Sequence, residues 1–84
     1  MKALVYVTLK PGVFDPQGKA VCSALHSLGH AEAAEVRVGK FIEVALQGID
    51  KARAAAQVKK MCETLLANTV IESYRFEIVE AGQQ

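Results

Sequence analysis

Residues 62–76 read CETLLANTVIESYRF, and this stretch joins the last predicted helix to the last predicted strand. Upstream and within it, apolar residues recur at helical spacing, at Ala54, Val58, Met61, Cys62 and Leu65. Asn68 follows where a left-handed residue commonly ends a helix. From Val70 to Val79 the apolar residues alternate instead, at Tyr74, Phe76 and Ile78. The stretch therefore predicts an amphipathic helix, its stop and a closing strand.

The segments before this junction predict a strand and a helix. Residues 2–9 alternate and are rich in β-branched side chains, which is typical of a strand. Asp15 and Pro16 suit the N-cap and first position of a helix that runs to about Leu28, and Gly29 can close it. Gly18 is unfavourable in a helix, which indicates close packing or a partner at the first turn.

Residues 36–46 have two interpretations. Alternating apolar residues predict either one long strand bent at Gly39 or a hairpin that turns near Gly39 and Lys40. The long strand places Lys40 on an apolar face, which is unfavourable. We therefore favour a break or a hairpin at this point. Asp50 then provides the N-cap of the second helix.

This order predicts an α+β fold of one domain covering residues 1–84, a ferredoxin-like βαβ(β)αβ chain with an antiparallel sheet and two helices on one face. A domain of this size buries a thin core. The second face of the first strand is also fairly apolar, so we expect the sheet to mediate a homo-oligomer, a dimer or a tetramer. We expect residues 80–84 to fray.

Composition excludes several classes of partner. The net charge is +1 without blocks of like charge, which argues against nucleic-acid and membrane-surface binding. No apolar run is long enough to span a membrane and no signal peptide is recognisable, so we expect a cytoplasmic protein. Cys22 and Cys62 lie in apolar helix faces, which favours structural burial over a disulfide or a reactive thiol.

No catalytic, cofactor or metal site is predicted. Cys22, His26 and His30 are spaced four residues apart, but His30 lies beyond Gly29 and no second cluster supplies a further ligand. The chain has neither a nucleophile elbow nor a glycine-rich phosphate loop.

Several ordered motifs resemble one family over nearly the whole chain. They are YVTLK (6–10), DPQG (15–18), ALHSLG (24–29), VRVGK (36–40), MCE (61–63), LLAN (65–68) and VIE (70–72), followed by Tyr74. The chain resembles PurS, the small subunit of phosphoribosylformylglycinamidine (FGAM) synthase in purine biosynthesis.

The resemblance implies a non-catalytic subunit that joins the PurL synthetase to the PurQ glutaminase and assists ammonia transfer. ATP and Mg²⁺ would be used by the complex and not bound by this chain. From polarity and position, the candidate partner-interface residues are Asp15, Gln17, Gly18, Arg37, Gly39, Lys40, Asn68, Glu72, Tyr74 and Arg75. The alternative is a stand-alone ACT-like regulatory domain that binds a small metabolite.

Overall fold

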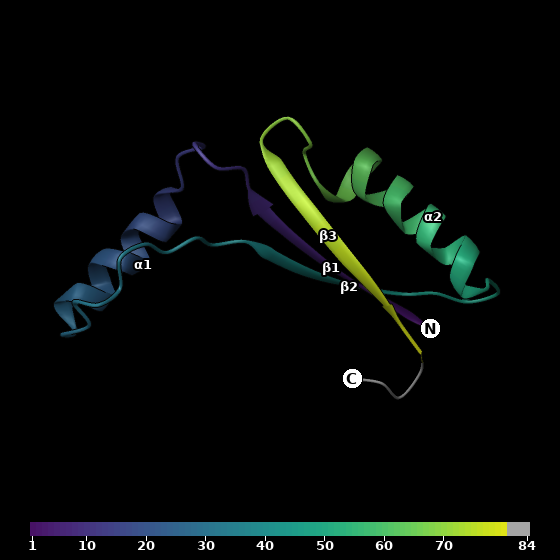
Figure 1. The fold of residues 1–84 in the computed structure, drawn as a ribbon, viewed down its shortest axis with the longest axis horizontal. Helices are drawn as coiled ribbons and strands as arrows, with labels where there is room; N and C mark the ends of the chain where they lie inside the picture. The colour runs from purple at the N-terminus through teal and green to yellow at the C-terminus, as the bar shows by residue number, and fades with distance from the viewer. Residues whose placement is uncertain (81–84) are drawn as a thin grey trace.

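The computed structural model describes residues 1–80 and has the predicted α+β order (Figure 1). Its elements are β1 (Lys2–Leu9), α1 (Pro16–Ser27), β2 (Lys40–Ala45), α2 (Lys51–Met61), the single π-helical turn η1 (Cys62–Leu66) and β3 (Glu72–Val79). The expectation that residues 80–84 fray falls, apart from Glu80, on residues outside the described part.

The three strands form one antiparallel sheet in the order β2-β1-β3, with β1 at its centre. Ala3, Val5 and Val7 of β1 are at most 1% exposed, and they are covered by Val58 of α2 and Cys62 of η1. Burying a valine side chain contributes roughly 1.5–3 kcal/mol, so this face of β1 supplies much of the core. The predicted alternation of β1 and β3 is confirmed.

The π-helical turn changes which residues reach the core at the end of α2. The N–H of Ala67 donates to the Cys62 carbonyl at 2.9 Å, a bond that spans five residues instead of four. The extra residue rotates the chain, so Leu66 packs on the core and Ala67 is buried, whereas Leu65 is 82% exposed. The prediction that Leu65 belongs to the buried stripe is therefore wrong.

The predicted left-handed stop at Asn68 is also wrong. No non-glycine residue among residues 1–80 has a positive φ. The chain leaves the helix through extended backbone at Ala67, and a turn over Asn68–Ile71 leads into β3.

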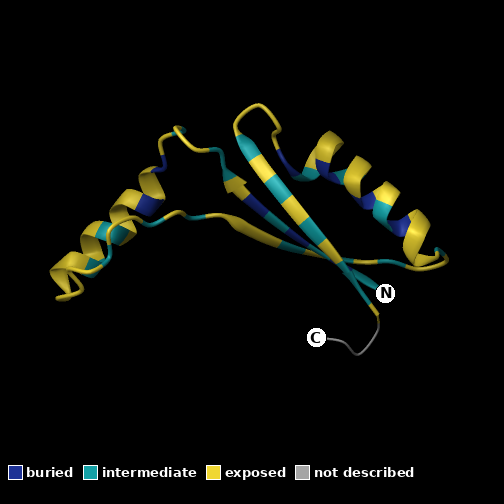
Figure 2. Ribbon diagram, viewed as in Figure 1, coloured by how far each residue is buried: buried dark blue, intermediate teal, exposed yellow. Residues whose placement is uncertain are grey.

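The ferredoxin-like arrangement predicted that α1 and α2 lie side by side on one face of the sheet. In the structure, α1 does not lie on that face. It projects beyond the end of the sheet and packs along residues 33–38, which follow it in sequence (Figure 1). Its exposed surface carries Phe14 just before the helix, Val21 within it and Leu28 just after it (Figure 2). Within residues 1–80, α2 and the turn η1 that follows it therefore cover the inner face of the sheet without α1.

The chain breaks at Gly39 without forming a hairpin. Residues 34–38 have no regular secondary structure and lie outside the sheet, and the chain runs on from them into β2, which begins at Lys40 (Figure 1). Lys40 keeps the parity of Ile42 and Val44 but is exposed, because it lies at the first position of the strand. The predicted break is confirmed, and the hairpin is not formed.

The molecule is elongated, with extents of 49 × 31 × 14 Å and a radius of gyration of 16.1 Å. A compact domain of this length would have a radius of gyration of about 12 Å. No helix within residues 1–80 is long and apolar enough to cross a membrane.

Candidate functional site

Half of the predicted interface residues meet at one hollow, where β1 ends and β2 and β3 begin. The hollow has a volume of about 360 Å³. It is lined by Asp15, Gln17, Gly39, Lys40 and Glu72, together with Val7, Thr8, Leu9, Pro16 and Val38. Residues far apart in the sequence meet here because β1 pairs with both other strands and Asp15 connects α1 to the chain that enters β2.

Asp15 holds the hollow together from beneath α1. Its Oδ1 accepts the Gly18 N–H at 2.8 Å, as the predicted N-cap, and its Oδ2 accepts the Val38 N–H at 2.8 Å. The carboxylate is only 8% exposed. The pKa of Asp15 is lowered below its ordinary value, first by the hydrogen bond from Val38 and then by that from Gly18. Burial acts in the opposite direction, and the positive charge of Arg37 adds to the lowering. One ionised side chain therefore fixes the start of α1 against residues 36–38.

Gly18 allows this close approach. A Cβ atom at Gly18 would overlap the carbonyl oxygen of Val36 and lie 2.9 Å from Asp15 Oδ2. The unfavourable glycine in the first helical turn is thus explained by packing against the following segment. Gly18 is buried, and it supports the hollow because it lets the first turn of α1 pack against Val36.

Arg37 lies on the other side of the β1–α1 loop. Its guanidinium donates to the carbonyls of Leu9 at 3.0 Å, Lys10 at 3.1 Å and Val13 at 3.3 Å. These are carbonyls of a loop that would otherwise have few protein partners. Arg37 therefore orders the loop that leads to α1, a structural role in addition to its predicted surface role.

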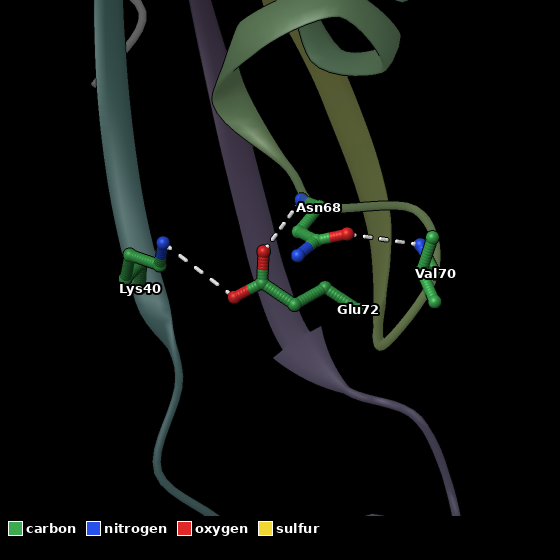
Figure 3. Close-up of polar contacts among 4 residues, drawn as sticks. All are labelled: Lys40, Asn68, Val70 and Glu72. Carbon is green, nitrogen blue, oxygen red and sulfur yellow. Dashed lines mark hydrogen bonds and ion pairs between the residues drawn. The ribbon is translucent and has the colours of Figure 1, made fainter.

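Glu72 connects β3 to the two neighbouring segments (Figure 3). Its Oε1 accepts the Asn68 N–H at 2.7 Å, and its Oε2 lies 3.5 Å from Lys40 Nζ. Asn68 Oδ1 in turn accepts the Val70 N–H at 3.1 Å, and its carbonyl accepts from Glu72 N at 2.7 Å. Asn68 thus stabilises the turn through side-chain and backbone hydrogen bonds. The amine of Lys40 is well exposed and remains available at the rim.

Tyr74 and Arg75 lie away from the hollow, on opposite faces of β3. Tyr74 is on the core face and donates to Glu63 Oε2 at 3.1 Å, and its pKa is raised by partial desolvation and by this carboxylate. Arg75 is on the outer face, where its guanidinium carbon lies 3.8 Å from the centre of the Tyr6 ring.

Sequence reasoning missed one member of this outer face. Phe41 is 53% exposed, and its ring centre lies 5.2 Å from that of Tyr6. Phe41, Tyr6 and Arg75 are cross-strand neighbours and form a row over the three strands. Finding this row requires the register of both strand pairs, which a single sequence does not reveal.

Cys22 and His26 lie on α1 and do not line the hollow, and Cys22 Sγ lies 3.8 Å from His26 Nε2. Cys22 Sγ and His26 Nε2 both contact the Ala33 carbonyl, at 3.5 and 2.7 Å, and His30 pairs with Glu32 instead. Cys62 is buried in the core as predicted, and burial raises the pKa of its thiol. Within residues 1–80, no three His, Cys, Asp or Glu side chains gather as a metal site.

Comparisons with known proteins agree with this picture. The model of the family "PurS: phosphoribosylformylglycinamidine (FGAM) synthase" matches residues 2–80. The PurS subunit of Bacillus subtilis is 51% identical over 83 residues, which cover 99% of this chain and 98% of that protein. The PurS subunit of Synechocystis is 54% identical over 74 residues, 88% of this chain and 74% of that protein.

Solved structures share the fold. A crystal structure of Bacillus subtilis PurS has a TM-score of 0.83 at 52% identity and covers 94% of this chain and 98% of its own. A chain in the PurLQS structure from Thermotoga maritima has a TM-score of 0.83 at 31% identity, with 93% of this chain and 95% of that chain covered. The family match over nearly the whole length, with these identities, shows that this chain belongs to the PurS family of FGAM synthase subunits.

Proposed function

We propose that this chain is the small, non-catalytic subunit of an FGAM synthase, where it joins a PurL-type synthetase to a PurQ-type glutaminase. The observation that carries the proposal is the full-length match to PurS subunits, together with the likeness of this chain to a chain in a structure named PurLQS. In such a complex the larger subunits would supply the ATP, Mg²⁺ and glutamine chemistry and this chain would assist ammonia transfer. The ACT-like alternative is not supported by the family match.

The hollow is the surface we propose for the larger subunits. Its rim presents Gln17 and Lys40, which are exposed, over a floor fixed by Asp15 and Gly18. A fixed backbone beneath exposed polar groups lowers the ordering cost of binding. Asn68 and Glu72 extend this rim through the turn before β3, and Gly39 gives the floor its close approach to β1.

The outer sheet face is a second proposed surface. Tyr6, Phe41 and Arg75 present aromatic and guanidinium groups, which are enriched at protein interfaces. We assign this face to self-association or to the larger subunits. We also propose that the complex is located in the cytoplasm.

Gln17→Arg tests the role of the hollow. Gln17 is exposed at the start of α1, so the longer charged side chain would obstruct the rim without disturbing the core. The matched control is Ser23→Arg, the same charge change at an exposed position further along the helix. Binding of each variant to the two larger subunits is measured by sedimentation velocity. We expect at least tenfold weaker assembly for Gln17→Arg alone, and equal assembly of both variants would refute this assignment.

A further inference from the structure

Helix α2 carries a concentration of positive charge that the composition of the whole chain conceals. Four of the ten lysine and arginine residues lie in its 11 residues, which include no Asp or Glu. The rest of the chain has more acidic than basic residues, which is why the net charge is only +1. All four are exposed, and we call them the basic face of α2: Lys51, Arg53, Lys59 and Lys60.

The cations of the basic face have no partner among residues 1–80. Elsewhere in the structure, Lys2, Lys40 and Arg75 each form an ion pair with a glutamate. Within the same range, no side chain of the basic face forms an ion pair, a side-chain hydrogen bond or a contact with an aromatic ring. These charges are therefore free to pair with groups on another molecule.

The stability of α2 does not account for the cations in its first turn. Lys51 and Arg53 lie there without an acidic residue, although the N-terminal end of a helix carries a partial positive charge. Asp50 Oδ1 accepts the Arg53 N–H at 2.8 Å, so a glutamate at position 53 would complete a capping box with this N-cap. Arginine at this position is unfavourable for the helix, and an anionic partner would compensate for it.

The shape of the basic face suits close docking. Arg53 and Lys60 are seven residues apart and lie two turns apart on one side of α2, away from the residues buried against the sheet. The exposed Ala52 and Ala56 lie between this side and Lys59. Figure 2 shows exposed residues along the outside of α2. Small side chains at the centre allow a partner backbone to approach, while the long cations around them can reach its carboxylates.

The basic face is separate from the hollow. The hollow is lined by residues of β1, the first turn of α1 and the starts of β2 and β3, and not by residues of α2. In Figure 1, α2 lies at the opposite end of the molecule from the arm that α1 and residues 34–38 form. A chain that joins two enzymes needs two surfaces that can be occupied at the same time, and the hollow and the basic face meet this requirement.

We propose that the basic face of α2 docks on an acidic surface of the larger subunit that does not occupy the hollow. The inference rests on the proposed function and adds a second binding surface to it. Complementary charges steer such an encounter and raise its association rate at low salt. The basic face has neither a large apolar side chain to insert into lipid nor an aromatic ring to stack on a nucleic-acid base, so an acidic protein surface fits it best.

Charge reversal tests this assignment. The α2 variant carries Arg53→Glu and Lys60→Glu, and the control carries Lys10→Glu and Lys19→Glu, which change the net charge by the same amount outside α2. Neither control lysine forms an ion pair within residues 1–80. Each variant is mixed with both larger subunits, and sedimentation velocity with one subunit labelled at a time shows which of them stays bound to this chain.

The expected result is a loss of binding to one subunit that depends on salt. At about 0.1 M salt, the α2 variant should bind that subunit at least about tenfold more weakly than the parent, and the control should bind both as the parent does. The difference should shrink toward 1 M salt, because the Debye length falls from about 10 Å to about 3 Å. The α2 variant should unfold at no lower a temperature than the parent, since a glutamate at position 53 complements the helix dipole.

Three results would overturn the inference and leave the proposed function standing. The first is equal binding of the parent and the α2 variant at low salt. The second is release of the same subunit that Gln17→Arg releases, because the two surfaces would then not be separate. The third is a variant that binds both subunits but no longer self-associates, which would assign the basic face to another copy. A parent chain that binds neither larger subunit would overturn the proposed function together with this inference.

Discussion

Replacing Gly18 with alanine should destabilise this protein, although alanine is the better helix former. On an open helix surface the change would stabilise by about 1 kcal/mol. Here the new methyl group would overlap the Val36 carbonyl oxygen, a backbone atom that cannot rotate away, and would lie 2.9 Å from Asp15 Oδ2. Overpacking typically costs about 1–3 kcal/mol, and a backbone clash belongs at the upper end. The expected net loss is about 2 kcal/mol.

Thermal unfolding at fixed protein concentration measures this loss. For a domain of this size, about 2 kcal/mol corresponds to a fall in Tm of roughly 8–16 °C. Ser23→Ala in the same helix is the control, and its exposed side chain makes the expected change smaller than about 0.5 kcal/mol. A Gly18→Ala variant as stable as the parent would show that α1 is not fixed against residues 36–38.

Other substitutions test separate parts of the fold. Val58→Ala removes two methyl groups from a fully buried position and should cost about 2 kcal/mol in urea unfolding; a loss below about 0.5 kcal/mol would contradict the core described here. Leu66→Ser should destabilise strongly and Leu65→Ser by less than about 0.5 kcal/mol, because the π-helical turn directs only Leu66 to the core; the reverse order would refute that turn. Asp15 has a lowered pKa, so its stabilisation is complete above its unfolded pKa of about 3.9 and is lost as the pH falls through the lower folded value. Asp15→Asn should therefore be less stable at pH 7 and should lose less stability than the parent below about pH 4; parallel pH profiles would contradict the ionised cap.

The elements with strong local signals were predictable. The alternation of β1 and β3 and the Asp15 cap depend on neighbours along the chain, and the structure keeps them. The end of α2 was not predictable from the sequence. There the Thr64 hydroxyl donates to the Lys60 carbonyl at 2.8 Å, a type of hydrogen bond that often bends helices, and Thr64 lies within the wider π-helical turn. The change of phase by one residue moves burial from Leu65 to Leu66.

The placement of α1 depends on contacts between distant residues. Its amphipathic pattern predicts that it buries a face but does not specify which surface covers it. The Val38 N–H bond to Asp15 and the Arg37 bond to the β1–α1 loop attach it to residues 36–38 instead. Asp15, Gln17, Gly39, Lys40 and Glu72 were predicted as candidates from polarity and position, whereas their meeting at one hollow and the place of Phe41 beside Tyr6 needed the strand register.

Most of the predicted interface residues have a physical role in the fold. Asp15, Gly18 and Arg37 hold the arm in place, and Lys40, Asn68 and Glu72 shape the rim where β2 and β3 begin. Under the proposed function, this small subunit would contribute surface and geometry to an assembly, and its partners would carry the chemistry.

Reconstitution of FGAM synthase activity tests whether this chain joins the synthetase to the glutaminase. PurL-type and PurQ-type subunits from the same source are assayed with ATP and with either glutamine or ammonia, with and without this chain. We predict that glutamine-dependent formation of the amidine requires this chain and that ammonia-dependent formation proceeds without it. Equal glutamine-dependent rates in its presence and absence would contradict its assignment as the subunit that joins the two activities.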